Sequence, residues 1–280
     1  GVCMNEEDRI NLLFCGDACV ADGVLLSTLS VLEHMRRPLH IFLLTAAVDA
    51  EQGSRRPMPP DFAARLQRVA QDTHPDSRVT RVDLTEAFSQ DPPIANMGTR
   101  FTPLCMLRLY ADLVPEMPER LLYLDSDVLC RRDFSTFYGQ DMTGVELCGV
   151  LDRYGSWFFR GGRRRRNYVN SGVLLLNMAE IRRSGLFARC RALCREKEMF
   201  MPDQTALNKL ARKRLAPRRY NEQADPRPDT VFQHFSTRFR FFPYVRTVTV
   251  KPWEEQRVHE VLGLQDYDGL YARYREEKKQ

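Results

Sequence analysis

The sequence predicts an α/β fold built on a parallel sheet. Strand-like and helix-like stretches alternate along residues 11–82, an order typical of right-handed βαβ units. An apolar run at 120–124 leads straight into Asp125 and Asp127, as a buried parallel strand does at the sheet edge where ligands bind. The chain has 280 residues, 43% of them hydrophobic, which is enough for one large domain or two small ones.

Hydrophobic periodicity defines the elements of the first part of the chain. In order, we expect a strand at 11–15, a helix at 24–34, a strand at 39–44, a helix at 62–71 and a strand at 79–82. A glycine- and proline-rich loop at 53–60 leads to Asp61, the expected N-cap of the second helix. No G-x-G-x-x-G motif or P-loop is present, which argues against a dehydrogenase or a Walker-type kinase.

The second part continues with further strands and helices. We expect a helix at 101–114, strands at 120–124, 145–151 and 170–177, helices at 181–197 and 205–211, and a strand at 231–235. The segment 152–168 is rich in aromatic residues, glycine and arginine and is expected to be a loop. The tail 254–280 is expected to be helical, polar and peripheral.

The net charge argues against a nucleic-acid-binding surface that extends over the whole protein. Lysine and arginine number 42 against 37 acids, a net charge of +5, which is too mild for a dedicated nucleic-acid binder. The excess is concentrated in the stretch 160–166. That stretch is interpreted as a solvated loop, or as an acceptor-side loop that holds a phosphorylated glycan or an anionic membrane surface.

The eight cysteines contain no C-x-x-C pair. Several lie in apolar stretches, so they are interpreted as small buried residues in a reducing compartment. Cys190 and Cys194 are four apart on a predicted helix without a second pair, which does not make a zinc site. With no signal peptide and no apolar run near about 18 residues, a cytoplasmic protein is expected.

The motif Asp125-Ser126-Asp127 is the main candidate site. Its acids are two apart, so in extended chain both carboxylates project to one side. Their repulsion is relieved by a divalent cation that prefers hard oxygen ligands. A solvated strand-to-turn junction is the alternative interpretation, because aspartate is common in turns.

Further motifs follow in a fixed order. They are Asn170-Ser-Gly-Val-Leu-Leu-Leu-Asn177, Asp203-Gln204, His234 and Lys251-Pro-Trp253. Together with Asp125-Ser-Asp127, this ordered set resembles glycosyltransferase family 8, which contains bacterial lipopolysaccharide-type galactosyl- and glucosyltransferases and glycogenin. The resemblance covers residues 11–253 and implies a GT-A fold, with a mixed, mostly parallel central sheet flanked by helices. It also implies a catalytic domain at 1–253 with a C-terminal helical tail at 254–280.

The resemblance also implies roles for individual residues. The metal ligands would be Asp125, Asp127 and His234, holding Mn²⁺ or alternatively Mg²⁺. The donor would contact Cys15, Gly16, Asp17, Arg108, Asp125, Ser126, Asp152, Asn170 and Lys251. In this assignment Asp17 pairs with uracil, Arg108 and Lys251 reach the sugar or diphosphate, and Asp203 with Gln204 faces the reacting carbon as the catalytic pair. Cys19 replaces a residue that is polar in many relatives.

The spacing of Lys251 departs from the family pattern. It follows His234 by 17 positions, with no glycine turn between them. Either the segment 237–250 is an extra hairpin that returns Lys251 to the site, or Lys251 is displaced. Pro243 and the run at 248–250 favour the hairpin.

The resemblance implies a metal-dependent retaining hexosyltransferase. It would move glucose or galactose from a UDP-sugar to a glycan or glycolipid acceptor, such as a bacterial surface polysaccharide or lipopolysaccharide-type precursor. Peripheral contact with an anionic membrane and a homodimer are further expectations, and no nucleic-acid partner is expected. The competing interpretations are a nucleotidyltransferase, whose glycine- and basic-rich signature is missing at Gly16-Asp17, and an RNA-binding module built on 160–166.

Overall fold

The computed structural model of the chain describes all residues except 1–5, 51–52, 99–102, 156–166 and 242. Its centre is a seven-stranded sheet with the strand order β10-β8-β9-β6-β1-β2-β5. In chain order these strands are β1 (Ile10–Cys15), β2 (Leu39–Thr45), β5 (Arg78–Asp83), β6 (Arg120–Leu124), β8 (Leu147–Leu151), β9 (Val169–Asn177) and β10 (Lys213–Leu215).

The sheet is mixed and mostly parallel. Strand β9 runs antiparallel to both of its neighbours, β6 and β8, whereas the other neighbouring strands run parallel. The mixed, mostly parallel central sheet that was expected for a GT-A fold is therefore confirmed. Its central strands are apolar on both faces, as buried strands of α/β proteins are.

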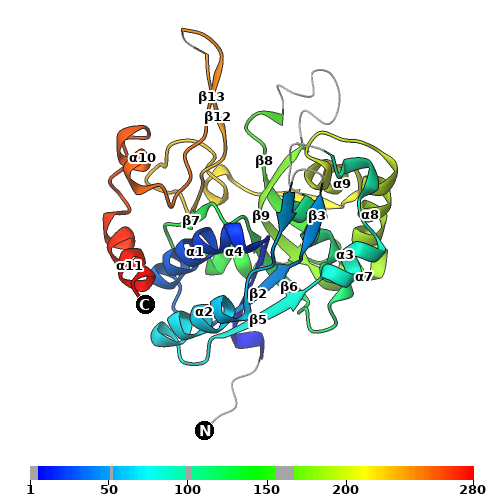
Figure 1. The fold of residues 1–280 in the computed structure, drawn as a ribbon, viewed down its shortest axis with the longest axis horizontal. Helices are drawn as coiled ribbons and strands as arrows, with labels where there is room; N and C mark the ends of the chain where they lie inside the picture. The colour runs from blue at the N-terminus through cyan, green and yellow to red at the C-terminus, as the bar shows by residue number, and fades with distance from the viewer. Residues whose placement is uncertain (1–5, 51–52, 99–102, 156–166, 242) are drawn as a thin grey trace.

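Helices cover both faces of the sheet (Figure 1). Successive residues of β1 alternate between two core clusters, with Leu12 and Phe14 in one and Leu13 in the other, because side chains of a strand point to opposite faces in turn. The first cluster is completed by α1 (Ala21–His34), α2 (Pro60–Thr73) and α11 (Asp268–Lys278). The second is completed by η4 (Pro103–Leu113), α7 (Met178–Ser184), α8 (Leu186–Glu196) and α9 (Pro202–Leu210).

Several sequence-based expectations need correction. The loop 53–60 contains β4 (Gly53–Arg55), which pairs with β3 (Val48–Ala50). Helix α2 begins at Pro60, and its N-cap is Pro59 and not Asp61; proline suits the first helical turn because its missing N–H has no partner there.

Two of the expected helices also differ. The helix expected at 101–114 is the 3₁₀-helix η4 in the described residues. The helix expected at 181–197 is two helices, α7 and α8, divided at Gly185. Gly185 adopts a left-handed conformation with φ of 66°, which ends an α-helix and which glycine adopts without a steric penalty.

Two short antiparallel pairs complete the region around the acidic motif. Strand β7 (Val128–Cys130) pairs with β11 (Phe232–His234), and β12 (Arg238–Arg240) pairs with β13 (Arg246–Val248). The other described elements are η1 (Glu6–Asp8), η2 (Ala18–Val20), α3 (Thr85–Gln90), η3 (Ile94–Asn96), α4 (Ser135–Tyr138), η5 (Arg218–Tyr220) and α10 (Glu255–Glu260).

The C-terminal tail is helical but not peripheral. Val258, Leu270 and Tyr271 are buried in the first core cluster, and the Tyr271 hydroxyl donates a hydrogen bond to the Pro252 carbonyl at 2.5 Å. The division of the chain at residue 253 stays a prediction. None of the helices in the described ranges has the length and apolar character needed to cross a membrane.

The cysteines of the described residues are all free thiols. Cys130, Cys148, Cys190 and Cys194 are buried, where they pack among the apolar residues of the two core clusters. This agrees with their interpretation as small buried residues.

Candidate active site

The two acids of the central motif meet through a turn. Asp125 follows the last residue of β6, its N–H donates to the Gly172 carbonyl at 2.8 Å, and the N–H of Val128 donates to the Asp125 carbonyl at 3.1 Å. This i to i+3 bond folds the chain between Asp125 and Asp127. The carboxylates therefore converge because of a turn, and not by projecting to one side of an extended strand as expected from the sequence.

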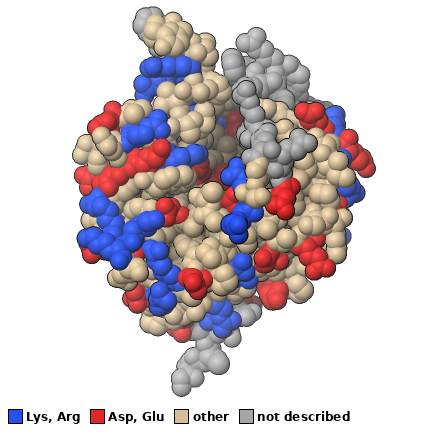
Figure 2. Space-filling model, in the orientation of Figure 1, with Lys and Arg blue, Asp and Glu red and all other residues tan. Residues whose placement is uncertain are grey.

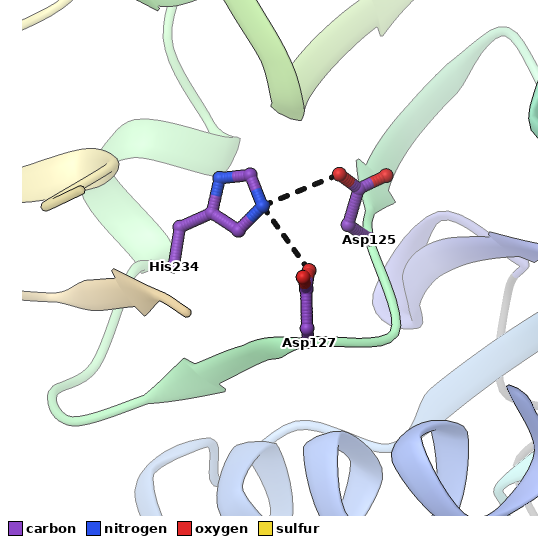
Figure 3. A group of neighbouring side chains, drawn as sticks. All are labelled: Asp125, Asp127 and His234. Atoms are coloured by element: carbon purple, nitrogen blue, oxygen red, sulfur yellow. Dashed lines mark ion pairs between the residues drawn. The ribbon is translucent and has the colours of Figure 1, made fainter. Parts of the chain in front are cut away.

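His234 is brought to the acids by strand pairing. In the antiparallel β7–β11 pair it lies opposite Val128, and the next N–H, that of Phe235, donates to the Asp127 carbonyl at 3.0 Å. Its Nε2 lies 3.4 Å from Asp125 Oδ2 and 3.1 Å from Asp127 Oδ1 (Figure 3). The three ligand atoms lie within 4.8 Å of one another.

The electrostatics of this cluster favour a bound cation. Burial disfavours the charged imidazole, but the neighbouring Asp127 and Asp125 outweigh it and raise the pKa of His234 to about 10. Oδ1 of Asp127 is buried, and its ion-pair partner among the described residues is His234 Nε2 at 3.1 Å. A divalent cation would replace the proton of this imidazole and supply the positive charge that the two carboxylates now draw from it. One imidazole among carboxylates suits Mn²⁺ somewhat better than Mg²⁺. These residues therefore fit a divalent metal ion.

The extra hairpin is present and places Lys251 beside the cluster. Strands β12 and β13 form an antiparallel pair within the segment 237–250. The Lys251 ammonium, which follows this segment, lies 2.7 Å from Asp127 Oδ2. Burial tends to raise the pKa of Asp127, but Lys251 and His234 outweigh this and hold it well below its usual range. Lys251 is thus a second positive group at the acids, while its contact with a diphosphate stays a prediction.

Arg108 joins the acidic motif to the predicted catalytic pair. It extends from η4, is 4% exposed, and its guanidinium lies 2.9 Å from Asp203 Oδ2 and 3.5 Å from Asp125 Oδ1. It also donates to the Ser171 carbonyl at 2.5 Å. The guanidinium stacks at 3.9 Å over the ring of Tyr123, whose hydroxyl donates to Asp125 Oδ1 at 2.5 Å. This packing fixes Arg108 between the two acids.

Asp203 and Gln204 lie side by side on the first turn of α9 and are both buried. Burial raises the pKa of Asp203, and Arg108 partly opposes this. The Gln204 carbonyl oxygen accepts bonds from the N–H and hydroxyl of Ser171 at 2.8 and 3.1 Å, while its amide donates to Asp152 Oδ2 at 3.2 Å. The orientation of the Gln204 side chain is therefore set by partners on both sides.

Asp152 and Asn170 belong to the same network. Asn170 donates to Asp152 Oδ2 at 2.9 Å, and its carbonyl oxygen accepts bonds from the Gly172 N–H at 2.9 Å and from Asn221 at 3.0 Å. The structure thus unites these two predicted sugar contacts with Gln204.

The predicted uridine contacts lie at the end of β1. Asp17 is buried, accepts a bond from the Cys19 N–H at 3.0 Å, and lies 3.6 Å from Arg55 of β4. Burial raises the pKa of the Cys15 thiol, and the charges of Arg108 and Asp125 also act on it. Cys15 is therefore close to the cluster, whereas no described hydrogen bond or ion pair of Asp17 reaches it.

The profile of glycosyltransferase family 8 matches residues 11–257. The chain belongs to glycosyltransferase family 8. No curated protein matches this family 8 member significantly.

Solved structures show the same fold. An active-site mutant of LgtC is 18% identical with a TM-score of 0.65, covering 93% of this chain and 100% of LgtC. The glycosyltransferase GlyE of Streptococcus pneumoniae TIGR4 is 18% identical with a TM-score of 0.62, covering 96% of this chain and 65% of GlyE. Mouse xyloside xylosyltransferase 1 is 14% identical with a TM-score of 0.56, covering 81% of this chain and 97% of that protein. With its mixed sheet, this family 8 member is a GT-A-type glycosyltransferase.

Sequence reasoning missed several residues of this family 8 site. Tyr123 precedes Asp125 by two positions, so strand periodicity could have placed both side chains on one face. Ser171 stands next to Asn170 in the Asn-Ser-Gly motif, and this position is a weak indication that Ser171 belongs to the site. Asn221 is fully buried and Arg55 lies on an unpredicted strand, and neither was indicated by any motif.

The arginine-rich stretch 160–166 lies outside the described residues, as do Trp157, Phe158 and Phe159. Its interpretation as an acceptor-side loop of the glycosyltransferase stays a prediction, and so does the RNA-binding alternative.

Proposed function

We propose that this glycosyltransferase is a metal-dependent retaining hexosyltransferase that uses a UDP-sugar. The observation that carries the proposal is the position of Arg108 and Lys251, which contact different acids of the metal-ligand cluster, Asp125 and Asp127. A nucleoside diphosphate needs positive charge when it leaves. Two carboxylates and one imidazole that could hold a divalent metal ion, together with two side-chain cations, would provide this positive charge to the diphosphate.

The residues around the cluster would hold the diphosphate and the sugar. A divalent ion bound by Asp125, Asp127 and His234 would offset the charge on the phosphate oxygens. Arg108 would contact the donor by a planar, bidentate arrangement, and Lys251 would act as a point charge.

The reaction breaks the bond between the anomeric carbon and the β-phosphate oxygen and forms one to the acceptor hydroxyl oxygen. The hydroxyl proton passes to the departing phosphate or to a carboxylate. Retention of configuration is open to two routes. Asp203 or Gln204 attacks first and is then displaced, as in retaining glycosidases, or the acceptor attacks from the face that the phosphate leaves.

The contacts of the catalytic pair bear on both routes. The Asp203 carboxylate is paired with Arg108 at 2.9 Å, which lowers its nucleophilicity. The Gln204 oxygen already accepts two bonds from Ser171. Both side chains are therefore well placed to position and stabilise the reacting sugar. To attack the anomeric carbon, Asp203 would first have to release Arg108, and Gln204 would have to release Ser171.

The proposed donor and acceptor rest on the resemblance to other members of the family. Asp17, with the backbone of Cys15 and Gly16, would contact the uridine, and Asp152 with Asn170 would contact glucose or galactose. The structural relative LgtC is a galactosyltransferase whose structure holds donor and acceptor sugar analogues. A bacterial surface polysaccharide or lipopolysaccharide-type precursor is the proposed acceptor, and the cytoplasm, at the inner face of the membrane, is the proposed location.

Calorimetric titration with UDP, UDP-glucose, UDP-galactose and UDP-N-acetylglucosamine, with and without Mn²⁺, tests the donor site. We expect Mn²⁺-dependent binding that Asp127→Ala abolishes and that Asp72→Ala, a change of an exposed acid on α2, leaves intact. NMR of the product then reports the anomeric configuration. Failure of every uridine nucleotide to bind, or binding that ignores both Mn²⁺ and Asp127, would overturn the proposal.

A further inference from the structure

The β12–β13 hairpin carries an apolar tip on a projecting stem. It rises from the body of the protein in Figure 1 and stands beside a hollow of the surface in Figure 2. At its tip Phe241, Tyr244 and Val245 are 57%, 64% and 64% exposed. Large apolar side chains gathered at one exposed point commonly mark an interaction site, whereas scattered ones do not.

The stem is fixed to the protein body, so the exposure of the tip is built into the fold. The Phe239 N–H donates to the Tyr154 hydroxyl at 3.1 Å, and the two rings meet edge to face at 4.9 Å. Arg238 pairs with Asp225 at 2.6 Å. Directly after β13, the carbonyl of Thr249 accepts a bond from Arg257 at 2.9 Å.

Two arginines face each other directly below the tip. Arg240 and Arg246 are partners in the β12–β13 register and both are exposed. Like charges at directly opposed positions destabilise a hairpin, and neither guanidinium forms an ion pair with a carboxylate of the described residues. Figure 2 shows lysine or arginine side chains in a band below the uncharged tip. Among the residues that the structure describes, this pair of arginines therefore lacks a counter-charge.

We propose that the tip of the β12–β13 hairpin inserts into the headgroup region of an anionic lipid bilayer. Aromatic side chains with a polar end favour the membrane–water interface, and apolar groups backed by arginine bind anionic lipid surfaces. In this pose the tip enters the interface while Arg240 and Arg246 lie at the level of the lipid phosphates.

A second copy of the chain fits the hairpin less well. Tip-to-tip association brings the Arg240–Arg246 pairs of two copies together without any carboxylate, and like-charge juxtaposition disfavours an interface. An anionic surface supplies the missing counter-charge to both arginines at once. Charge complementarity therefore selects the bilayer as the occupant.

Docking through this hairpin also orients the transfer site. The chain passes from His234 into β12 and returns from β13 to Lys251, so both ends of the hairpin lead into the metal and diphosphate site. Insertion of the tip would hold that site at a short, fixed distance from the bilayer, within reach of an acceptor carried on a lipid. This last step rests on the proposed transferase activity, whereas the docking itself does not.

Vesicle flotation tests the docking without donor or metal. The probes are vesicles of phosphatidylcholine alone and vesicles with about 30 mol% phosphatidylglycerol, which carry the negative surface potential. We expect the wild-type protein to bind the anionic vesicles only. In the Arg240→Gln/Arg246→Gln variant the affinity for these vesicles should fall about 25-fold, which is about fivefold for each charge removed. The matched control Arg36→Gln/Arg68→Gln removes two exposed arginines elsewhere and should leave binding unchanged.

The tip is tested in the same way. Tyr244→Ser/Val245→Ser should lose most of the anionic-vesicle binding, whereas Ile94→Ser/Leu113→Ser, which changes two exposed apolar residues of η3 and η4, should keep it. Fluorescence of Tyr244→Trp should shift to the blue and be quenched by brominated lipid, and that of Ile94→Trp should not.

The outcomes separate docking from catalysis. Loss of vesicle binding in the hairpin variants alone, with Mn²⁺-dependent UDP binding retained, supports the proposal. Wild-type protein that ignores anionic vesicles, or hairpin variants that bind them as tightly as wild type, overturns it. A change in oligomeric state of the tip variants without any change in vesicle binding overturns it in favour of a second copy. If vesicle binding behaves as expected but no UDP-sugar binds, the proposed function fails and the docking stands.

Discussion

At Gly172, the addition of a single methyl group should be enough to disturb the proposed metal site. It lies in β9 against the imidazole of His234, and a Cβ at Gly172 would stand 2.3 Å from Cε1 and 2.5 Å from Nδ1 of that ring. The same Cβ would lie 3.0 Å from Asn170 Oδ1. Gly172→Ala therefore presses on His234 without removing any ligand.

The size of the effect follows from these distances. Carbon atoms in contact prefer a separation of about 3.5 Å or more, so the ring needs to retreat by about 1 Å. His234 is 5% exposed, and overpacking of a buried site costs about 1–3 kcal/mol of stability. Changes in the residues that support a metal ligand typically weaken metal binding about 10- to 100-fold, which is the loss we expect for Mn²⁺.

Calorimetry with Mn²⁺ and thermal unfolding measure the two effects separately. Gly269→Ala in α11 is the matched control, because a Cβ there meets no atom within 4 Å; it should leave Mn²⁺ binding unchanged and raise stability slightly. In the His234→Ala background, Gly172→Ala should cause no further loss of Mn²⁺ affinity, because the two changes act through one ring.

A Gly172→Ala variant that binds Mn²⁺ as tightly as wild type, at unchanged ionic conditions, would show that the added Cβ does not displace His234 from the site. A second loss of affinity of the same size in the His234→Ala background would also contradict the prediction, because that loss would have to arise from another part of the site.

Three further predictions concern the charges of the site and the fold. Lys251→Met should bind Mn²⁺ more tightly without nucleotide, because the ammonium competes for Asp127 at 2.7 Å, but should bind UDP about tenfold more weakly; titration that shows both affinities falling together would contradict this. Arg108→Met should lower the free energy of unfolding in urea by about 3–5 kcal/mol, because it leaves the buried Asp203 without its cation; a loss below about 1 kcal/mol would argue against the pairing. Burial lowers the pKa of His40 from 6.5 to about 4, so protonation favours the unfolded chain and stability should fall as the pH drops from about 6.5 to about 4. His40→Gln should flatten that part of a Tm-against-pH curve, and an unchanged slope would rule out His40 as its source.

Much of the fold was predictable from local pattern. Strands β1, β2 and β6 are short, apolar runs that alternate with stretches of helix-like periodicity, and this pattern depends only on which residues are buried. The ends of the helices differ from the expected ones where the backbone conformation of a particular residue sets them, as at Pro59 before α2 and Gly185 after α7. The family resemblance implied a mixed sheet but not which strand is reversed. The structure alone shows that β9 is antiparallel to its neighbours, because an apolar run carries no information about its direction.

Local sequence pattern specifies which chemical groups are present: a pair of acids after a buried strand, a histidine in an apolar strand, and a lysine 17 positions after that histidine. The tertiary structure alone decided how they meet. A turn at Ser126 and the β7–β11 pairing bring His234 to the acids, the β12–β13 pairing returns Lys251, and Arg108 reaches Asp203 from η4. The physical reason is that ion pairing depends on distance between side chains in space, and these residues lie as far as 143 positions apart, from Arg108 to Lys251.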